Sequence, residues 1–323
     1  MALIIWTGSN LVLSSAVSLG VVIAFINTLE KIFVPIREFT GQITEIQRSF
    51  AAFEHLDELF SEPLEGFEQR FYSDEEIGDK LKTFTSIDFK GVSFRYKQGD
   101  PYVLKNVSFC LAQGQNLALV GTTGSGKSTI MRLLTKTYEG YEGSILVNGL
   151  ELSNIPKLKL AKLFTMMQQD VFLFEQDVSF NIGLAKVDQT KIIESAKYVY
   201  AHDFIQSLPN RYETVLTSGG DQLSAGQKQL ISFARAMTSD GQLMLLDEAT
   251  SSIDSVTESL IQKALERVFQ ERTVIAIAHR LSTIRESDQI LVLEAGEIIE
   301  RGDHDELVKA QGVYAGLLQE ELV

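Results

Sequence analysis

Gly121-Thr122-Thr123-Gly124-Ser125-Gly126-Lys127-Ser128-Thr129 is the stretch that decides the fold, because it fits the pattern G-x-x-x-x-G-K-[ST] without a mismatch. An apolar run at 117–120, typical of a buried strand, precedes it, and a helix-like run at 130–134 follows it. This order of strand, loop and helix favours a phosphate-binding loop over a glycine-rich turn that binds no nucleotide.

The residue types of the loop explain how it would bind a nucleoside triphosphate. Its glycines let the backbone curl so that N–H groups converge on phosphate oxygens, and the helix beginning near Lys127 adds its positive dipole end. We expect all nine residues to line the nucleotide, with Lys127 reaching the β- and γ-phosphates and the Ser128 hydroxyl ligating Mg²⁺.

Two later segments indicate which class of nucleotide-binding protein this is. One is Leu223-Ser224-Ala225-Gly226-Gln227, and the other is the apolar run 243–246 that leads directly into Asp247 and Glu248. In this order they resemble the ATPase domain of ATP-binding cassette (ABC) proteins, whose signature is Leu-Ser-Gly-Gly-Gln; this chain has Ala225 at the third position. The resemblance covers nearly the whole chain, and it implies a P-loop α/β ATPase domain with a β-rich edge and a helical subdomain.

The signature implies a nucleotide site shared between two chains. It lies where a loop enters a helix, so the Ser224 hydroxyl, nearby N–H groups and the helix dipole can face an anion. In the family, two domains pair head to tail, so Ser224, Gly226 and Gln227 would contact the ATP of a partner. The methyl group of Ala225 would lie close to the partner's γ-phosphate. An ordinary N-capped amphipathic helix is the alternative.

The two carboxylates at 247 and 248 follow a predicted central strand. Catalytic groups of open α/β sheets lie at the carboxyl ends of strands, so we expect Asp247 to hold the Mg²⁺ shell and Glu248 to polarise the attacking water. A pair of helix-capping carboxylates is the alternative.

Four single residues match further positions of the family. Gln169 resembles the Q-loop glutamine, which contacts Mg²⁺ and water, and His279, after the apolar run 274–278, resembles the switch histidine that bonds the γ-phosphate. Tyr96 resembles the aromatic residue that stacks on adenine, and Asp254 the D-loop aspartate that links two ATP sites. The alternatives, in the same order, are a surface amide, a structural histidine, sheet packing and a helix N-cap.

The N-terminal region is apolar: residues 1–29 contain no charged side chain. Residues 19–35 are predicted to form the core of a membrane helix, 36–59 its helical extension, and 2–6 the tail of a preceding helix, with Thr7-Gly8-Ser9-Asn10 as an interruption. The run resembles the last membrane helix of an ABC exporter. A secretory signal and a buried soluble helix are the alternatives.

Composition, together with the resemblance to an ABC exporter, implies the domain boundaries. We assign 1–60 to the end of the transmembrane domain (the end of its fifth helix, and its sixth helix with a cytoplasmic extension), 61–82 to an acidic linker, and 83–323 to the ABC cassette.

The net charge of −14 argues against a nucleic-acid partner. The single cysteine, Cys110, excludes an internal disulfide and is expected in the core.

Together these observations predict an ATP-hydrolysing subunit of an ABC exporter, using ATP and Mg²⁺. Its partners would be a membrane, an unidentified transported substrate and a second half-transporter, identical or different, with the ATPase domain in the cytoplasm. An exporter half has six membrane helices, so this chain is either a fragment or receives the missing helices from another chain. A soluble ABC-type ATPase is the alternative, which the single cassette and the uncharged N-terminus disfavour. A catalytically silent subunit is disfavoured by the presence of Lys127, Asp247, Glu248 and His279.

Overall fold

The computed structural model describes residues 2–61, 73–167, 171–184, 187–247, 254–278 and 284–321. The chain forms two compact units, Met1–Phe67 and Glu68–Val323, and each is described by itself.

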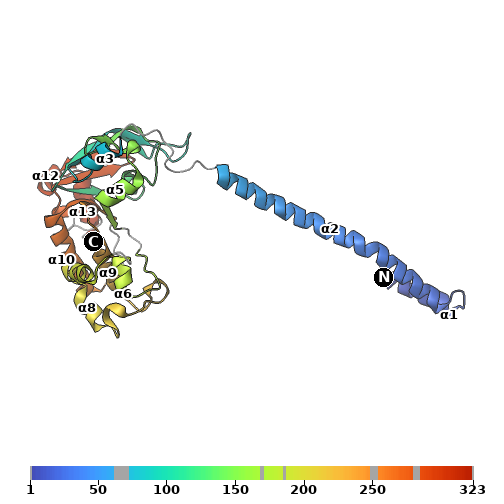
Figure 1. Cartoon of the computed structure of the whole chain (residues 1–323). Coiled ribbons are helices and arrows are strands. Elements are labelled where there is room, and N and C mark those ends of the chain that lie inside the picture. The colour runs from blue at the N-terminus through green and yellow to red at the C-terminus, as the bar shows by residue number, and fades with distance from the viewer. Residues whose placement is uncertain are drawn as a thin grey trace. The chain divides into compact units, whose positions relative to one another are not determined.

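The N-terminal unit is a helical hairpin of α1 (Ala2–Leu13) and α2 (Leu19–Ser61), drawn in blue in Figure 1. The 43 residues of α2 confirm that one helix continues from the apolar segment through the predicted extension. Within the described residues, α2 is the one helix long and apolar enough to cross a membrane.

The predicted interruption at Thr7-Gly8-Ser9-Asn10 is wrong, because α1 runs through it. The Thr7 hydroxyl donates to the Leu3 carbonyl oxygen at 2.8 Å, so its polar group is satisfied inside the helix. A Cβ on Gly8 would lie 2.7 Å from Cγ1 of Val22, so glycine at this position permits close packing of α1 on α2.

Two sheets form the frame of the second unit. A six-stranded sheet has the order β10-β9-β3-β8-β7-β6, with β10 antiparallel to β9 and the other pairs parallel. Its strands are β3 (Asn116–Val120), β6 (Phe164–Met167), β7 (Leu243–Asp247), β8 (Thr273–Ile277), β9 (Gln289–Glu294) and β10 (Glu297–Gly302). Every residue of β3 and β8 is buried, as expected of central parallel strands covered on both faces.

The second sheet is antiparallel and forms the predicted β-rich edge. Its order is β2-β1-β4-β5, with β1 (Ser86–Phe94), β2 (Leu104–Ala112), β4 (Glu142–Val147) and β5 (Leu150–Glu151). Burial alternates along β2, so Phe109 and Leu111 point inward while Cys110 is exposed. The prediction of Cys110 as a core residue is therefore wrong.

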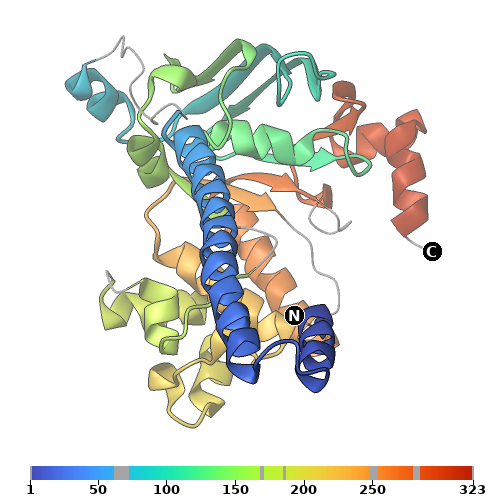
Figure 2. The same cartoon turned by 90° about the vertical axis from the view of Figure 1, so that its right-hand side faces the viewer.

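Helices complete the cassette. The helical subdomain contains α6 (Val178–Gly183), α7 (Gln189–Tyr198), α8 (His202–Ser207) and α9 (Ala225–Thr238), with the short 3-10 turns η2 (Arg211–Glu213) and η3 (Ser218–Gly220). The other helices that the structure describes in the cassette are α3 (Asp74–Lys80), α4 (Lys127–Leu134), η1 (Leu152–Asn154), α5 (Lys157–Leu163), α10 (Ser255–Glu271), α12 (His304–Ala310) and α13 (Val313–Glu321). Figures 1 and 2 show the helical subdomain, yellow-green to yellow, at the opposite end of the cassette from the antiparallel sheet.

Helix α3 was not predicted from the sequence. Ser73 accepts a hydrogen bond from the backbone N–H of Glu76, and the Glu76 carboxylate accepts one from the N–H of Ser73, which is a capping box. Ile77 on this helix is fully buried in the same hydrophobic core as Phe89 and Leu117. The core of the cassette therefore includes a residue that lies before position 83.

Candidate nucleotide site

The phosphate-loop motif joins β3 to α4, as the sequence predicted. Gly121 has φ of +145°, and a Cβ built on it would lie 2.1 Å from the carbonyl oxygen of Leu293. Gly126 precedes α4 with φ of +108°, and its Cβ would lie 2.6 Å from Cδ2 of Leu104. Glycine is therefore required at both positions by backbone conformation and by close packing against the two sheets.

Lys127 begins α4 with its ammonium group folded over the loop. Its Nζ donates to the carbonyl oxygens of Gly121 at 2.6 Å and Thr122 at 2.8 Å, and the residue is only 6% exposed. Burial lowers the pKa of the Lys127 ammonium group, while the nearby carboxylate of Asp247 acts to raise it. A buried cation next to the loop carbonyl oxygens is suited to binding the oxygens of a phosphate chain.

The register of the parallel strands places Asp247 beside the phosphate loop. Leu119 of β3 pairs with Ile277 of β8, and Ile277 pairs with Asp247 of β7. The carboxyl ends of these strands therefore share one edge of the sheet, and the loop after β3 begins one residue beyond Val120. This geometry brings Lys127, at the head of α4, within electrostatic range of Asp247.

All three predicted catalytic residues lie outside the described residues: Gln169, Glu248 and His279. The described residues stop directly before Glu248 and His279, and two residues before Gln169. Strand β6 ends at Met167, β7 at Asp247, and the segment after β8 at Ala278. All three strands run parallel to β3 in the six-stranded sheet.

Tyr96 lies next to the helix that follows the phosphate loop. Its hydroxyl is 2.9 Å from Oγ1 of Thr129, and its ring packs edge-on against Phe94 and Tyr138, at centroid distances of 5.2 and 5.0 Å. The side chain remains 44% exposed, so ring surface is available for stacking. The sequence did not predict Tyr138 as a neighbour, because only the tertiary fold brings it to Tyr96.

Ser128 and Asp247 are the described members of the predicted magnesium site. Hydroxyl and carboxylate oxygens are ligands that Mg²⁺ prefers; Ser128 lies in the first turn of α4, and Asp247 ends β7. Among the residues that the structure describes, no cluster of three or more His, Cys, Asp and Glu side chains could hold a metal ion. These two residues would therefore bind the ion together with phosphate oxygens and water.

The signature caps the N-terminus of α9. Oγ of Ser224 accepts from the N–H of Gln227 at 3.2 Å, and Oε1 of Gln227 accepts from the N–H of Ser224 at 3.0 Å. Ser224 and Ala225 are exposed, whereas Gly226 and Leu223 are buried. The start of α9 is thus a fixed surface feature with its helix dipole directed outward.

Asp254 is the N-cap of α10, where its carboxylate accepts from the N–H of Thr257 at 2.9 Å. This hydrogen bond is the main reason that the pKa of Asp254 is lowered from its ordinary value. Asp254 therefore has the helix-capping role that the sequence offered as the alternative to a D-loop aspartate.

Known proteins resemble this chain over nearly its whole length. Residues 104–251 match the ABC transporter family. The Bacillus subtilis ABC transporter ATP-binding protein YfiC is 38% identical over 97% of this chain and 51% of its own length. An ATP-dependent lipid A-core flippase of Chromohalobacter salexigens is 37% identical over 99% of this chain and 54% of its own length.

A solved structure shares the fold over nearly the whole chain. It is a bacterial Atm1-family ABC exporter with ATP bound, with a TM-score of 0.73 and 30% sequence identity over 95% of this chain and 54% of that one. The chain thus spans about half the length of the relatives it matches.

Proposed function

We propose that this chain, which belongs to the ABC transporter family, is the ATP-hydrolysing part of an exporter subunit that acts across a membrane. The register of β3, β8 and β7 carries this proposal, because it sets the phosphate loop with Lys127 beside the carboxylate of Asp247. A phosphate cradle next to a carboxylate is the arrangement needed to bind ATP with a divalent cation.

The chemistry follows from the residues at this edge of the sheet. Loop N–H groups and Lys127 would bind the phosphates, and Tyr96 would stack on the adenine ring. Ser128, Asp247 and Gln169 would hold Mg²⁺, which neutralises charge on the phosphates when bound. Glu248 would accept a proton from the attacking water, and His279 would hydrogen-bond the γ-phosphate.

A second copy or a related half-transporter would complete the site. Ser224 and Gln227 are fixed at an exposed helix N-terminus, which is a ready site for an anion. The phosphate loop of the same chain has its own helix N-terminus at α4, so a phosphate bound at the start of α9 would come from a partner. We infer a head-to-tail pair in which Ser224, Gly226 and Gln227 close over the partner's ATP.

The membrane role rests on α2 and on the relatives. Helix α2 presents exposed apolar side chains along the predicted spanning segment, including Val21, Ile23, Phe25 and Phe33. One relative is named an ATP-dependent lipid A-core flippase and another, from Mycobacterium bovis, a fatty acid ABC transporter ATP-binding/permease protein, so the names point to different substrates. We therefore assign no transported substrate to this chain. We infer that the ATPase domain lies in the cytoplasm.

Mixing two inactive variants tests the shared site. Lys127→Ala removes the cation of a chain's own phosphate loop, and Ser224→Arg blocks the signature that the chain offers to its partner. Each variant alone should hydrolyse ATP poorly, while a mixed dimer contains one composite site with both parts intact. We expect steady-state ATPase of the equimolar mixture in detergent to exceed that of either variant alone. No gain, with heterodimers demonstrated, would refute a shared site.

A further inference from the structure

The ring of Tyr96 is held by two other aromatic rings. Phe94, the last residue of β1, meets the Tyr96 ring at a centroid distance of 5.2 Å and an interplanar angle of 86°, and Tyr138 meets it at 5.0 Å and 72°. Phe94 and Tyr138 also contact each other, at a centroid distance of 5.9 Å. Rotation about χ2 of an aromatic side chain is only broadly restricted by the side chain itself, so these two crossed rings fix the plane of the Tyr96 ring.

The hydroxyl of Tyr96 is tied to the helix that follows the phosphate loop. It lies 2.9 Å from Oγ1 of Thr129, which is in the first turn of α4 and only 4% exposed. Lys127, two residues earlier on the same helix, is the residue whose ammonium group folds over the loop. The far end of the Tyr96 side chain is therefore fixed relative to the phosphate loop.

Tyr138 is itself fixed at the other end of α4. Its N–H donates to the Arg132 carbonyl oxygen at 3.3 Å, and the guanidinium group of Arg132 lies 6.0 Å from the centre of the Tyr138 ring. Lys136, two residues before Tyr138, donates from Nζ to the carbonyl oxygens of Ser153 at 2.9 Å and Ile155 at 3.1 Å. The turn that carries Tyr138 is thus attached both to α4 and to the segment around η1.

Helix α4 therefore supports Tyr96 at two points. Thr129, in its first turn, holds the hydroxyl, and Tyr138, four residues beyond the last residue of the helix, holds the ring. The base and the phosphates of a nucleotide are joined covalently, so a platform and a loop mounted on one helix keep a spacing that a single nucleotide can match. A platform fixed in advance also loses less conformational entropy when a base stacks on it.

We propose that Tyr138 is a positioning residue for the adenine ring. It holds the Tyr96 ring in the orientation in which its exposed surface stacks on the base, at the spacing from the phosphate loop that a nucleoside triphosphate requires. Tyr138 acts through Tyr96 and does not itself have to contact the nucleotide. The inference rests on the proposed function, because it requires adenine to stack on Tyr96.

Two ligands separate positioning of the base from damage to the phosphate loop. ATP carries a base and phosphates, whereas tripolyphosphate carries phosphates alone; each is titrated with Mg²⁺ into the full chain in detergent and followed by calorimetry. We expect Tyr138→Leu to bind ATP about three- to tenfold more weakly, because aromatic pair contacts have effects of this size. Its affinity for tripolyphosphate should stay within about twofold of the parent, since the loop N–H groups and Lys127 are unchanged.

Steady-state ATP hydrolysis gives an independent readout. With Tyr138→Leu, KM for ATP should rise while kcat stays within about twofold, because loss of an interaction made equally in the ground state and the transition state changes KM alone. Tyr138→Phe keeps the ring and should retain the parent ratio of the two affinities. Tyr138→Met is flexible and has no ring, so it should behave like Tyr138→Leu, and it carries the test if Tyr138→Leu does not fold.

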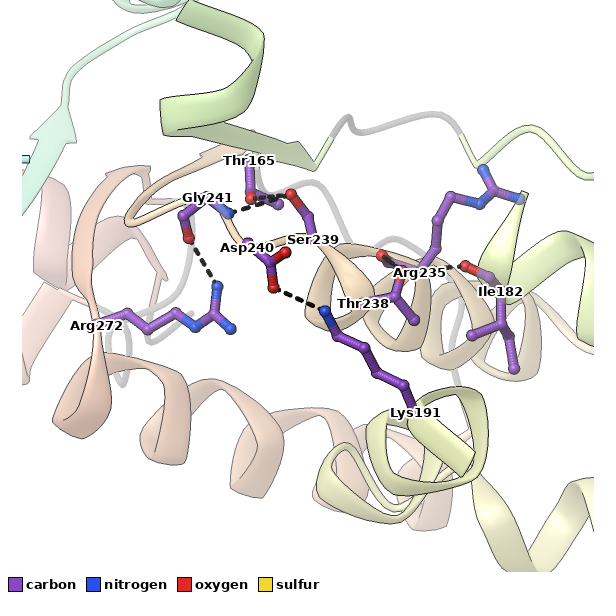
Figure 3. A network of polar contacts seen from close by, with 9 residues as sticks. All are labelled: Thr165, Ile182, Lys191, Arg235, Thr238, Ser239, Asp240, Gly241 and Arg272. Carbon is purple, nitrogen blue, oxygen red and sulfur yellow. Dashed lines mark hydrogen bonds and ion pairs between the residues drawn. The ribbon is translucent and has the colours of Figure 1, made fainter. Parts of the chain in front are cut away.

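Removing the Tyr96 hydroxyl tests the second support. Tyr96→Phe keeps the ring but loses the bond to Thr129, so we expect ATP affinity to fall about threefold, the net effect of one hydrogen bond. Thr165→Val removes a similar bond elsewhere: Oγ1 of Thr165 donates to Oγ of Ser239 at 3.0 Å, as Figure 3 shows, and β6 lies three strands from β3. This control should leave both affinities within about twofold.

Tyr198→Leu is the matched control for loss of a ring. Tyr198 lies on α7 in the helical subdomain, where the guanidinium group of Arg267 is 4.1 Å from the centre of its ring. Its hydroxyl donates to the Glu271 carboxylate at 2.7 Å. The same truncation at this position should leave the ratio of ATP affinity to tripolyphosphate affinity within about twofold of the parent.

A Tyr96→Leu protein distinguishes failure of this inference from failure of the proposed function. If Tyr96→Leu leaves the ratio of the two affinities unchanged, adenine does not stack on Tyr96, and both the platform and the inference are refuted. If Tyr96→Leu lowers the ratio but Tyr138→Leu and Tyr138→Met do not, the platform stands and the role of Tyr138 is overturned. Equal losses of ATP and tripolyphosphate affinity with Tyr138→Leu also overturn that role, because damage to the phosphate loop would then explain the effect.

Discussion

Gly121→Ala tests whether the phosphate loop is shaped by contact with the neighbouring strand. The new methyl group would lie 2.1 Å from the carbonyl oxygen of Leu293 on β9, well inside contact distance, so loop and strand must separate. Backbone strain at φ of +145° costs about 1–3 kcal/mol. Overpacking against the strand adds about 1–3 kcal/mol.

Gly114→Ala is the matched control for this substitution. Gly114 has φ of +81°, but a Cβ there meets no atom within 4 Å. Gly114→Ala should therefore be destabilised by backbone strain alone, which costs about 1–3 kcal/mol. We expect Gly121→Ala to be the less stable protein and also to bind ATP more weakly, because its loop N–H groups are displaced.

Urea unfolding followed by far-ultraviolet circular dichroism in detergent measures the first difference, and a direct ATP titration measures the second. Equal unfolding free energies and equal ATP affinities for the two variants would refute the packing argument for Gly121.

Four further predictions follow from single groups. Glu248→Gln should bind ATP but hydrolyse it about 10²–10⁴-fold more slowly, and turnover within about threefold of the parent would contradict a general base. Lys127→Ala should weaken ATP binding in a titration by about tenfold or more, the loss expected for a charge-assisted contact; unchanged affinity would count against its phosphate role. Chelation of divalent cations should abolish hydrolysis, and Mg²⁺ should restore it. Partial burial and a hydrogen bond to Asp88 raise the pKa of the exposed Cys110 thiol, so Asp88→Asn should speed its alkylation at pH 8 by increasing the thiolate fraction.

Local signals explain why the frame of the nucleotide site could be predicted. The apolar runs before Gly121 and Asp247 are buried on both faces as β3 and β7, and such strands have a continuous apolar sequence. The glycines of the loop and the N-cap at Ser224 mark where helices α4 and α9 begin. These features depend on neighbours along the chain, so one sequence is enough to find them.

Other features depend on contacts between distant residues and could not be predicted. Ile77 is buried because α3 packs on the core of the cassette, although the surrounding sequence is acidic. Cys110 has apolar neighbours in sequence, but the alternation of β2 turns it outward. The hydrogen bonds of Arg235 could not be predicted from the sequence, since its partners Phe172 and Asn181 lie more than fifty residues before it.

The structure also changes how the two interpretations of the signature relate to each other. An N-capped helix and a site for a partner's phosphate were alternatives in the sequence, yet the capping box at Ser224 is compatible with both. A serine hydroxyl that accepts from the Gln227 N–H still carries its own hydrogen, which it can donate to an anion. The cap fixes the side chains of Ser224 and Gln227 before any partner arrives, so less conformational entropy is lost on closure. In the proposed head-to-tail pair, capping at this position would therefore preorganise the shared site.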